Sequence, residues 1–137
     1  MSATSIEIVE VSARDGLQNE KRVAFATAQK IALIERMAAA GAKRLEVASF
    51  VRPDAVPQMA DAEAVIAGLS LPEDIVTIGL VMNKRGALRA LETQVREIGA
   101  VCVASDSFAM ANQGQGSMES VRVAADILKL ARQEGRR

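Results

Sequence analysis

Short strand-like segments alternate with longer helix-like segments along the 137-residue chain, and this alternation limits the fold more than any other feature. Runs rich in branched apolar residues, which are typical of buried strands, lie at residues 6–11, 44–50, 76–82 and 100–105. Apolar residues at helical spacing follow these runs at residues 28–40, 61–69, 84–98 and from 117 onward. Strict alternation of this kind predicts a parallel sheet with right-handed crossovers.

The predicted fold class is therefore α/β, with about four parallel (β/α) units in one domain that spans residues 1–137. Two architectures satisfy this pattern: the first half of an eight-stranded TIM barrel, and a compact open sheet. A half barrel would leave two unpaired strand edges and an uncovered inner face. We therefore expect either further sequence after Arg137 or self-association into a homo-oligomer.

Five residues are predicted to begin or end the helices. Thr27, Asn83 and Ser117 have side chains that accept hydrogen bonds from the first free amides of a helix. Gly41 stands where a glycine would end the first helix, and Gly99 is expected to end the third.

The composition argues against several classes of partner. Lys and Arg together number 17, as do Asp and Glu, so the formal net charge is zero, and aromatic residues make up 2% of the chain. Without a basic stripe or stacking aromatics, no nucleic-acid partner is expected. Apolar stretches fall short of the ~20 residues of a membrane span, so no membrane partner is expected. The start lacks the pattern of a targeting segment and Cys102 is the only cysteine, which together predict a cytoplasmic protein.

The loops that follow the strands are long and polar, whereas those that follow the helices are short glycine turns. The long loops lie at residues 12–26, 51–60 and 106–116. In α/β folds, functional residues collect at the carboxyl ends of the strands, so we expect a functional site at this edge. The chain contains no histidine, and chemistry at this edge must therefore use other groups.

Arg14, Asp15 and Gly16 directly follow the first strand. An aspartate there can offer oxygen ligands to a hard cation such as Mg²⁺. A neighbouring arginine can stabilise an oxyanion that forms beside such a metal. Glycine would let the backbone turn sharply. A solvated turn or a local ion pair is the alternative reading of so short a motif.

Glu46 lies between Leu45 and Val47 in the second strand. If these two apolar residues pack against helices, the alternation of side chains turns Glu46 toward the inner face, together with Asp15. A carboxylate in that position is a candidate acid or base. Alternatively, the strand is partly exposed and Glu46 pairs with a surface lysine.

Two further positions carry groups that could take part in chemistry. Asn112, in the polar loop after the fourth strand, could donate amide hydrogen bonds to a carboxylate or a thioester, although amide-rich loops also occur without a function. Cys102 lies in an apolar run and is expected to be buried, and no histidine is present to activate it as a nucleophile.

Three stretches of the sequence resemble a known family when they are taken together. VEVSARDGLQNEK, LEVASFVRPDAVPQMAD and SFAMANQG are similar to the amino-terminal half of the 3-hydroxy-3-methylglutaryl-CoA lyase family, whose members are metal-dependent TIM-barrel lyases and synthases. The resemblance covers nearly the whole chain in order. It implies retro-aldol cleavage of an acyl-CoA substrate of this type to acetyl-CoA and a 3-oxo acid such as acetoacetate, a reaction of leucine degradation.

The resemblance also implies roles for particular residues. Arg14 would stabilise the enolate, Asp15 would bind the divalent metal (Mg²⁺ or Mn²⁺) and take part in proton transfer, and Glu46 would be an essential carboxylate. The same motifs place Gln18 near the substrate and Lys21 near the CoA moiety.

Asn112 would contact the substrate, since it follows Phe108 at the family's spacing. Two departures are Ala13, where proline is common in the family, and Ala111, where lysine can occur. These departures leave the acyl substrate open among branched thioesters of the 3-hydroxy-3-methylglutaryl type.

The family's histidine metal ligands, its carboxy-terminal metal-binding asparagine and its mobile catalytic cysteine belong to its second half. We therefore expect this chain to be an amino-terminal half and to be inactive by itself. A second hypothesis is a non-catalytic α/β module that self-associates or pairs with a separate carboxy-terminal half. A third, a condensing enzyme similar to 2-isopropylmalate synthase, fits less well because RDGLQNE differs from the RDGEQ that is common there.

Overall fold

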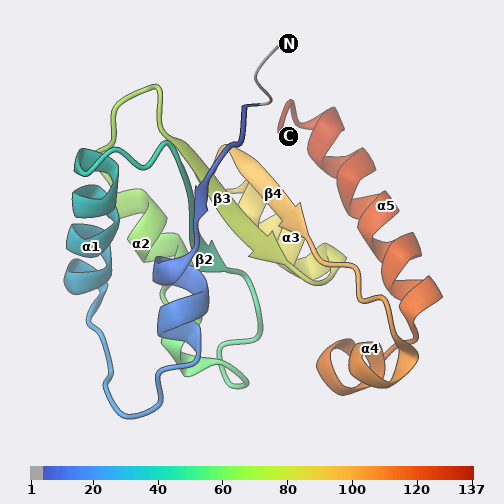
Figure 1. Ribbon diagram of the computed structural model, residues 1–137. Coiled ribbons are helices and arrows are strands. Elements are labelled where there is room, and N and C mark those ends of the chain that lie inside the picture. Colours follow the sequence, from blue (N-terminus) through green and yellow to red (C-terminus); the bar gives the residue numbers. More distant parts are fainter. Residues whose placement is uncertain (1–4) are drawn as a thin grey trace.

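Four parallel strands pair in the order in which they occur along the chain, as a computed structural model of residues 5–137 shows (Figure 1). The strands are β1 (Val9–Glu10), β2 (Arg44–Ser49), β3 (Val76–Val81) and β4 (Glu97–Ala100). An open doubly wound sheet reverses its strand order at a switch point, whereas a barrel adds each strand beside the last. The observed order is that of a barrel.

Most of the helices lie on the outer side of this sheet, and the helix that directly follows β4 lies beyond the carboxyl end of that strand (Figure 1). They are α1 (Thr27–Ala39), α2 (Ala62–Gly68), α3 (Lys84–Leu91), α4 (Asp106–Gln113) and α5 (Ser117–Gln133), with two short turns, η1 (Ser12–Gly16) and η2 (Pro57–Met59), in the loops after β1 and β2. Among residues 5–137, no helix has the length and apolar character that crossing a membrane requires.

The hydrophobic core fills the space between the sheet and the helices. Its largest fully buried apolar side chains are Ile34, Leu45, Phe50, Val65, Val81, Val95 and Ile127. Each such side chain stabilises the fold by about 1.5–3 kcal/mol relative to an exposed position. Leu45 and Ile34 show the pattern: the first points from β2 toward the helices, and the second points from α1 toward the sheet.

The first and fourth strands differ from their predicted ranges. β1 contains only two residues, and Ile6 and Ile8 before it are 88% and 80% exposed, because β1 is an edge strand that pairs on one side alone. The fourth strand begins at Glu97, three residues before the predicted start at residue 100. The preceding helix ends early because the hydroxyl of Thr93 donates to the carbonyl of Ala90 and ends the helical hydrogen bonds there.

Two of the five predicted helix-end residues are confirmed. The Asn83 side chain accepts a hydrogen bond from the amide of Gly86 at 2.9 Å at the start of α3. Gly41 follows α1 with φ +108°, a conformation that residues with a Cβ rarely adopt. Gly99 is not a helix end, since it lies inside β4.

Thr27 and Ser117 are helical residues and not caps. Their hydroxyls instead join neighbouring segments: Thr27 donates to Asp61 at 2.7 Å, and Ser117 donates to Asp106 at 2.7 Å.

The segment after β4 differs most from the prediction. Residues 106–113, expected as a loop, form α4, because Ala109 packs inward and Asp106 binds both the amide and the hydroxyl of Ser117 at the start of α5. Cys102, expected to be buried in a strand, is exposed, because β4 already ends at Ala100.

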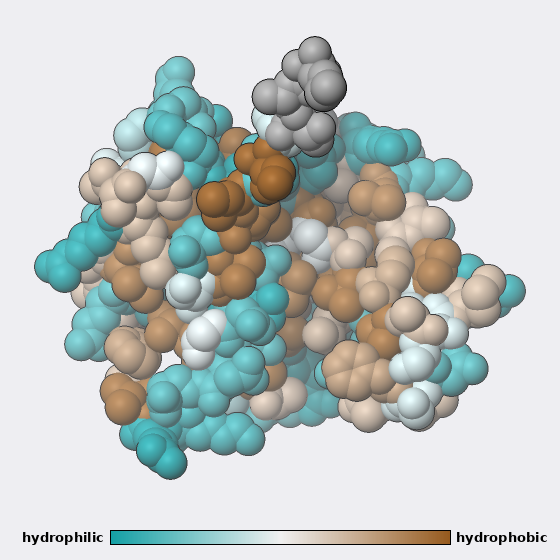
Figure 2. Space-filling model, viewed as in Figure 1, coloured by the Kyte–Doolittle hydropathy of each residue, from teal (hydrophilic) through white to brown (hydrophobic). Residues whose placement is uncertain are grey.

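Within residues 5–137, the inner, concave face of the sheet is only partly covered, by the η1 turn that packs on β2. Figure 2 shows that side hollowed between the part formed by β1 and α1 and the part formed by α4 and α5. At the outer edge of β4, the amide of Ile98 donates to the carbonyl of Arg137 at 2.7 Å, so the chain after α5 returns to the sheet in the position of a next strand.

We predict that Gly86→Ala lowers the free energy of unfolding by about 2 kcal/mol. An added Cβ would lie 2.5 Å from the carbonyl oxygen of Phe50, so α3 would have to move away from the end of β2. Urea unfolding monitored by circular dichroism measures the change.

Gly16→Ala is the matched control, and it also corrects the expected role of this glycine. Gly16 does not have a positive φ, and an added Cβ would meet only Ser12, at 3.8 Å. The turn therefore does not require glycine, and this variant should unfold like the wild type. Equal losses in the two variants would contradict the packing described for α3.

Candidate active site

Glu46 lies on the concave face of β2. Its neighbours Leu45 and Val47 are buried in the core between sheet and helices, at 0% and 2% exposure, so the alternation of the strand turns Glu46 the other way. Its side chain is 12% exposed and accepts a hydrogen bond from Nε of Arg14 at 2.5 Å. The alternative pairing with a surface lysine is thus not what the structure contains.

Arg14 reaches Glu46 because the chain coils immediately after β1. The amides of Arg14 and Asp15 both donate to the carbonyl of Val11, at 3.1 and 2.7 Å, which closes the η1 turn. The guanidinium then lies between two carboxylates, with Nη1 2.9 Å from Oδ1 of Asp15 and Nε bound to Glu46. Arg14, Asp15 and Glu46 therefore meet at the carboxyl edge of the sheet.

These three groups differ in exposure. The side chains of Arg14 and Glu46 are 17% and 12% exposed, whereas Asp15 is 55% exposed. A partly buried ion pair interacts more strongly than a solvated one, because water screens it less. The pair therefore fixes Arg14, and Asp15 remains accessible to a ligand.

Of the other three residues with implied roles, the structure ties only Gln18 to the strand that carries Glu46. Gln18 accepts a hydrogen bond from the hydroxyl of Ser49, at the end of β2, at 2.9 Å. Lys21 is exposed, and Asn112 is exposed on α4, where its amide donates to the carbonyl of Phe108 at 2.9 Å. Within residues 5–137, no hydrogen bond joins Lys21 or Asn112 to Arg14, Asp15 or Glu46.

Sequence reasoning did not single out Ser49. It is fully buried, yet its hydroxyl binds a side chain of the motif that follows β1. The available signal was a serine near the carboxyl end of a predicted buried strand, next to the polar motif that follows the neighbouring strand.

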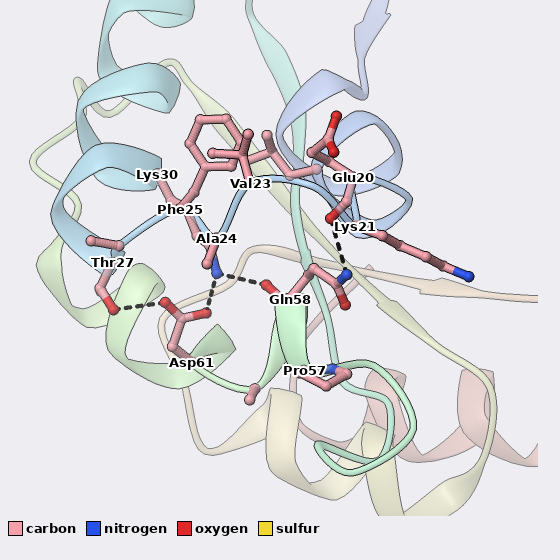
Figure 3. A pocket seen from close by; sticks show the side chains of 13 residues that line it. Glu20, Lys21, Val23, Ala24, Phe25, Thr27, Lys30, Pro57, Gln58 and Asp61 are labelled. Carbon is pink, nitrogen blue, oxygen red and sulfur yellow. Dashed lines mark hydrogen bonds and ion pairs between the residues drawn. The ribbon is translucent and has the colours of Figure 1, made fainter.

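A cavity of about 310 Å³ lies beside the end of the motif and not over the ion pair (Figure 3). It is bounded by residues 17–30 and by the loop around η2. On its floor, Nζ of Lys30 donates to Asp61 at 2.5 Å and to the carbonyl of Gln58 at 2.6 Å. Figure 3 shows Lys21 pointing away from this cluster.

The cluster links the two rim loops to each other. The Gln58 amide donates to the carbonyl of Glu20 at 3.0 Å, and Asp61 also accepts from Thr27 at 2.7 Å. Burial by itself would raise the pKa of Asp61, but the hydrogen bonds from Lys30 and Thr27 and the lysine charge outweigh it. The pKa of Asp61 therefore lies below the ordinary value for an aspartate.

The residues at the rim fit one ligand position of a hard cation. Oδ2 of Asp15 has no hydrogen-bond partner within residues 5–137, and its carboxylate is accessible. In that part of the chain, however, no group of three or more His, Cys, Asp or Glu side chains is arranged to hold a metal ion. Mg²⁺ commonly uses one or two carboxylates with water and substrate oxygens, so Asp15 fits such a role but does not form a complete site.

The strand order and the ionic groups at the carboxyl ends place this chain among (β/α)-barrel proteins, whose functional sites lie at that rim. The chain belongs to the HMGL-like family, whose sequence model matches residues 5–137. This confirms the family resemblance of the sequence motifs.

Three known proteins illustrate the relationship. A Pseudomonas aeruginosa 3-hydroxy-3-isohexenylglutaryl-CoA/hydroxymethylglutaryl-CoA lyase is 38% identical over 93% of this chain and 42% of its own length. The HMG-CoA lyase of Brucella melitensis superposes with a TM-score of 0.91 at 40% identity, over 98% of this chain and 47% of that one. The Acinetobacter baumannii HMG-CoA lyase, solved with coenzyme A and 3-methylmalate, gives a TM-score of 0.87 at 36% identity, over 95% of this chain and 43% of that one.

These superpositions confirm the predicted parallel α/β class. The chain spans less than half the length of each of these relatives.

We predict that Asp61→Asn lowers the free energy of unfolding by about 3 kcal/mol at pH 7, because it leaves the buried ammonium of Lys30 without a counter-charge. The matched control is Asp54→Asn, which breaks an ion pair with Arg52 whose side chains are 66% and 74% exposed. The control should leave the free energy of unfolding nearly unchanged, because water screens a pair this exposed. Urea unfolding of both variants measures the difference, and equal effects would contradict the buried character of the Lys30 pair.

The Asp61 contribution should also depend on pH. Since the folded-state pKa of Asp61 is lowered, its stabilisation is complete above the ordinary aspartate pKa and is lost as the pH falls through the lowered value. The stability difference between wild type and Asp61→Asn should therefore shrink below about pH 4. Urea unfolding between pH 7 and pH 3 tests this, and a difference that stays constant over that range would contradict it.

Proposed function

We propose that this chain carries the enolate-stabilising part of a carbon–carbon lyase. Its substrate would be a CoA thioester of the 3-hydroxy-3-methylglutaryl type, and its products acetyl-CoA and a 3-oxo acid. The observation that carries this proposal is the Arg14 guanidinium, held by Glu46 at 2.5 Å and by Asp15 at 2.9 Å at the carboxyl edge of the sheet. Family membership supports the lyase chemistry.

The substrate class follows from chemistry that the relatives share. The Pseudomonas aeruginosa relative is named for two substrates that differ in the group on C3, and the Acinetobacter baumannii relative was solved with coenzyme A. We therefore propose a 3-hydroxyglutaryl-CoA skeleton with a branched C3, and leave the size of the C3 group open.

In the proposed reaction, a base takes the proton of the C3 hydroxyl, and the oxygen electron pair forms the new carbonyl. The bond between C2 and C3 breaks, and its electrons form the enolate of acetyl-CoA, with charge on the thioester oxygen. Protonation at C2 completes acetyl-CoA. Arg14 would stabilise the charge on that oxygen, an electrostatic effect that is large in a partly buried site.

Asp15 would hold a divalent cation with one carboxylate oxygen, and the cation would lower the pKa of the C3 hydroxyl. Glu46 would keep Arg14 in place, because its carboxylate occupies Nε of the guanidinium. Arg14 Nη2, which has no partner within residues 5–137, would remain for the substrate. These roles need the guanidinium to stay between the two carboxylates throughout the reaction.

We predict that Arg14→Gln, measured in an active protein that contains residues 5–137, lowers kcat for acetyl-CoA release by about 100- to 1,000-fold, the usual effect of losing one oxyanion donor. Arg52→Gln is the control, because Arg52 lies on an exposed rim loop and its side chain pairs, among residues 5–137, only with Asp54. Full activity in Arg14→Gln would exclude the proposed role.

The purified 137-residue chain by itself is expected to release no acetyl-CoA. Asp15 offers one ligand position, and the described residues contain no cluster that could complete a metal site. A coupled assay for free acetyl-CoA with added Mg²⁺ or Mn²⁺ is the measurement. Turnover would show that these residues are sufficient and would overturn this part of the proposal.

A further inference from the structure

A β-bulge in β2 changes which side chains of this strand face the site. Glu46 lies opposite Ile78 of β3, and Ala48 lies opposite Gly79, so Val47 is an extra residue in the register. Bulges of this kind bend a strand and redirect the side chains that follow.

The bulge brings Ser49 to the same face as Glu46. Ser49 lies opposite Leu80, and Leu80 is two residues beyond Ile78, so these two residues of β3 share a face. On a regular strand, two residues three positions apart would point to opposite faces. Ser49 and Glu46 therefore both point toward the turn that follows β1.

That turn presents two side chains to β2. Residues 12–18 are helical, and Arg14 and Gln18, four residues apart, lie on the same side of the turn. Each is anchored to β2 by one hydrogen bond: Arg14 donates to Glu46 at 2.5 Å, and Ser49 donates to Oε1 of Gln18 at 2.9 Å.

The burial of Ser49 decides the orientation of the Gln18 amide. The Ser49 hydroxyl has one proton and is 0% exposed. With Oε1 facing Ser49, this proton is used. With the amide reversed, Nε2 would donate to the hydroxyl oxygen, and the hydroxyl proton would be left without an acceptor in a buried place, which is unfavourable. Oε1 therefore faces Ser49, and the two N–H groups of Nε2 face away from it.

We infer that Ser49 is a positioning residue that makes Gln18 a hydrogen-bond donor beside Arg14. Within residues 5–137, neither Nε2 of Gln18 nor Nη2 of Arg14 donates to another group. Together they form a pair of donors for one oxygen of the substrate. This inference rests on the proposed function, which identifies that oxygen as the thioester oxygen where the enolate charge develops.

A double-mutant cycle in an active protein that contains residues 5–137 tests the inference. Gln18→Ala should lower kcat about 100-fold, with a smaller change in KM, because the donor acts on charge that develops during the reaction. Gln18→Glu keeps an acceptor for Ser49 but removes the donors, so it should be as slow as Gln18→Ala. Ser49→Ala should lower kcat about tenfold.

The double variant Ser49→Ala/Gln18→Ala distinguishes positioning from a merely structural role. If Ser49 acts through Gln18, the double variant is as active as Gln18→Ala alone. If the two losses multiply, or if Gln18→Glu is fully active, the inference is wrong.

A measurement without substrate separates this inference from the proposed function. In NMR spectra of the 137-residue chain, the Gln18 side-chain amide should show a rigid heteronuclear NOE that is lost in Ser49→Ala. A mobile amide in the wild type would overturn the role of Ser49 itself. If the amide is rigid but no protein that contains residues 5–137 cleaves an acyl-CoA thioester, the proposed function fails, and with it the ligand assigned to the donor pair.

Discussion

The ion pair between Arg14 and Glu46 is the interaction on which the rest of the site depends. It joins the turn after β1 to the second strand, and this matters because β1 contributes only two paired residues to the sheet. Two partly buried charges lose hydration when they meet, so the pair is stable only where the geometry is good and each group has further partners. Asp15 supplies such a partner, at 2.9 Å from Nη1. The arginine is thereby fixed at the rim, and its Nη2, which has no partner among residues 5–137, stays available to a ligand.

A second cluster of ion pairs lies on the same face of the sheet. At the amino ends of the strands, Arg44 pairs with Glu7 at 2.7 Å and with Glu97, and its Nε is buried without a partner among residues 5–137. The helix-facing side of the same strands is apolar and fully packed, as Leu45 and Val81 show. Stability is thus concentrated between sheet and helices, which leaves the concave face to carry charge.

Sequence patterns predicted the features that depend on short-range periodicity. The apolar residues on both sides of Glu46 predicted that its side chain faces the concave side of the sheet, because side chains alternate along a strand. The end of the first apolar run predicted that Arg14 lies at the carboxyl edge of the sheet, where it contacts Glu46. They did not predict the β-bulge at Val47, which depends on the register with β3, or the early end of α3, which depends on one hydrogen bond from Thr93. The contact of Ser49 with Gln18 and the Lys30 cluster also join segments about 30 residues apart. Periodicity carries no information about such contacts.

The most direct test of this account is the coupling between Arg14 and Glu46 in the folded chain. Urea unfolding of Arg14→Gln, Glu46→Gln and the double variant gives this coupling as the departure from additivity. The account predicts a coupling of about 1–3 kcal/mol in favour of the intact pair. A coupling within about 0.3 kcal/mol of zero would mean that the guanidinium is not held by β2, and would contradict the structure of the site.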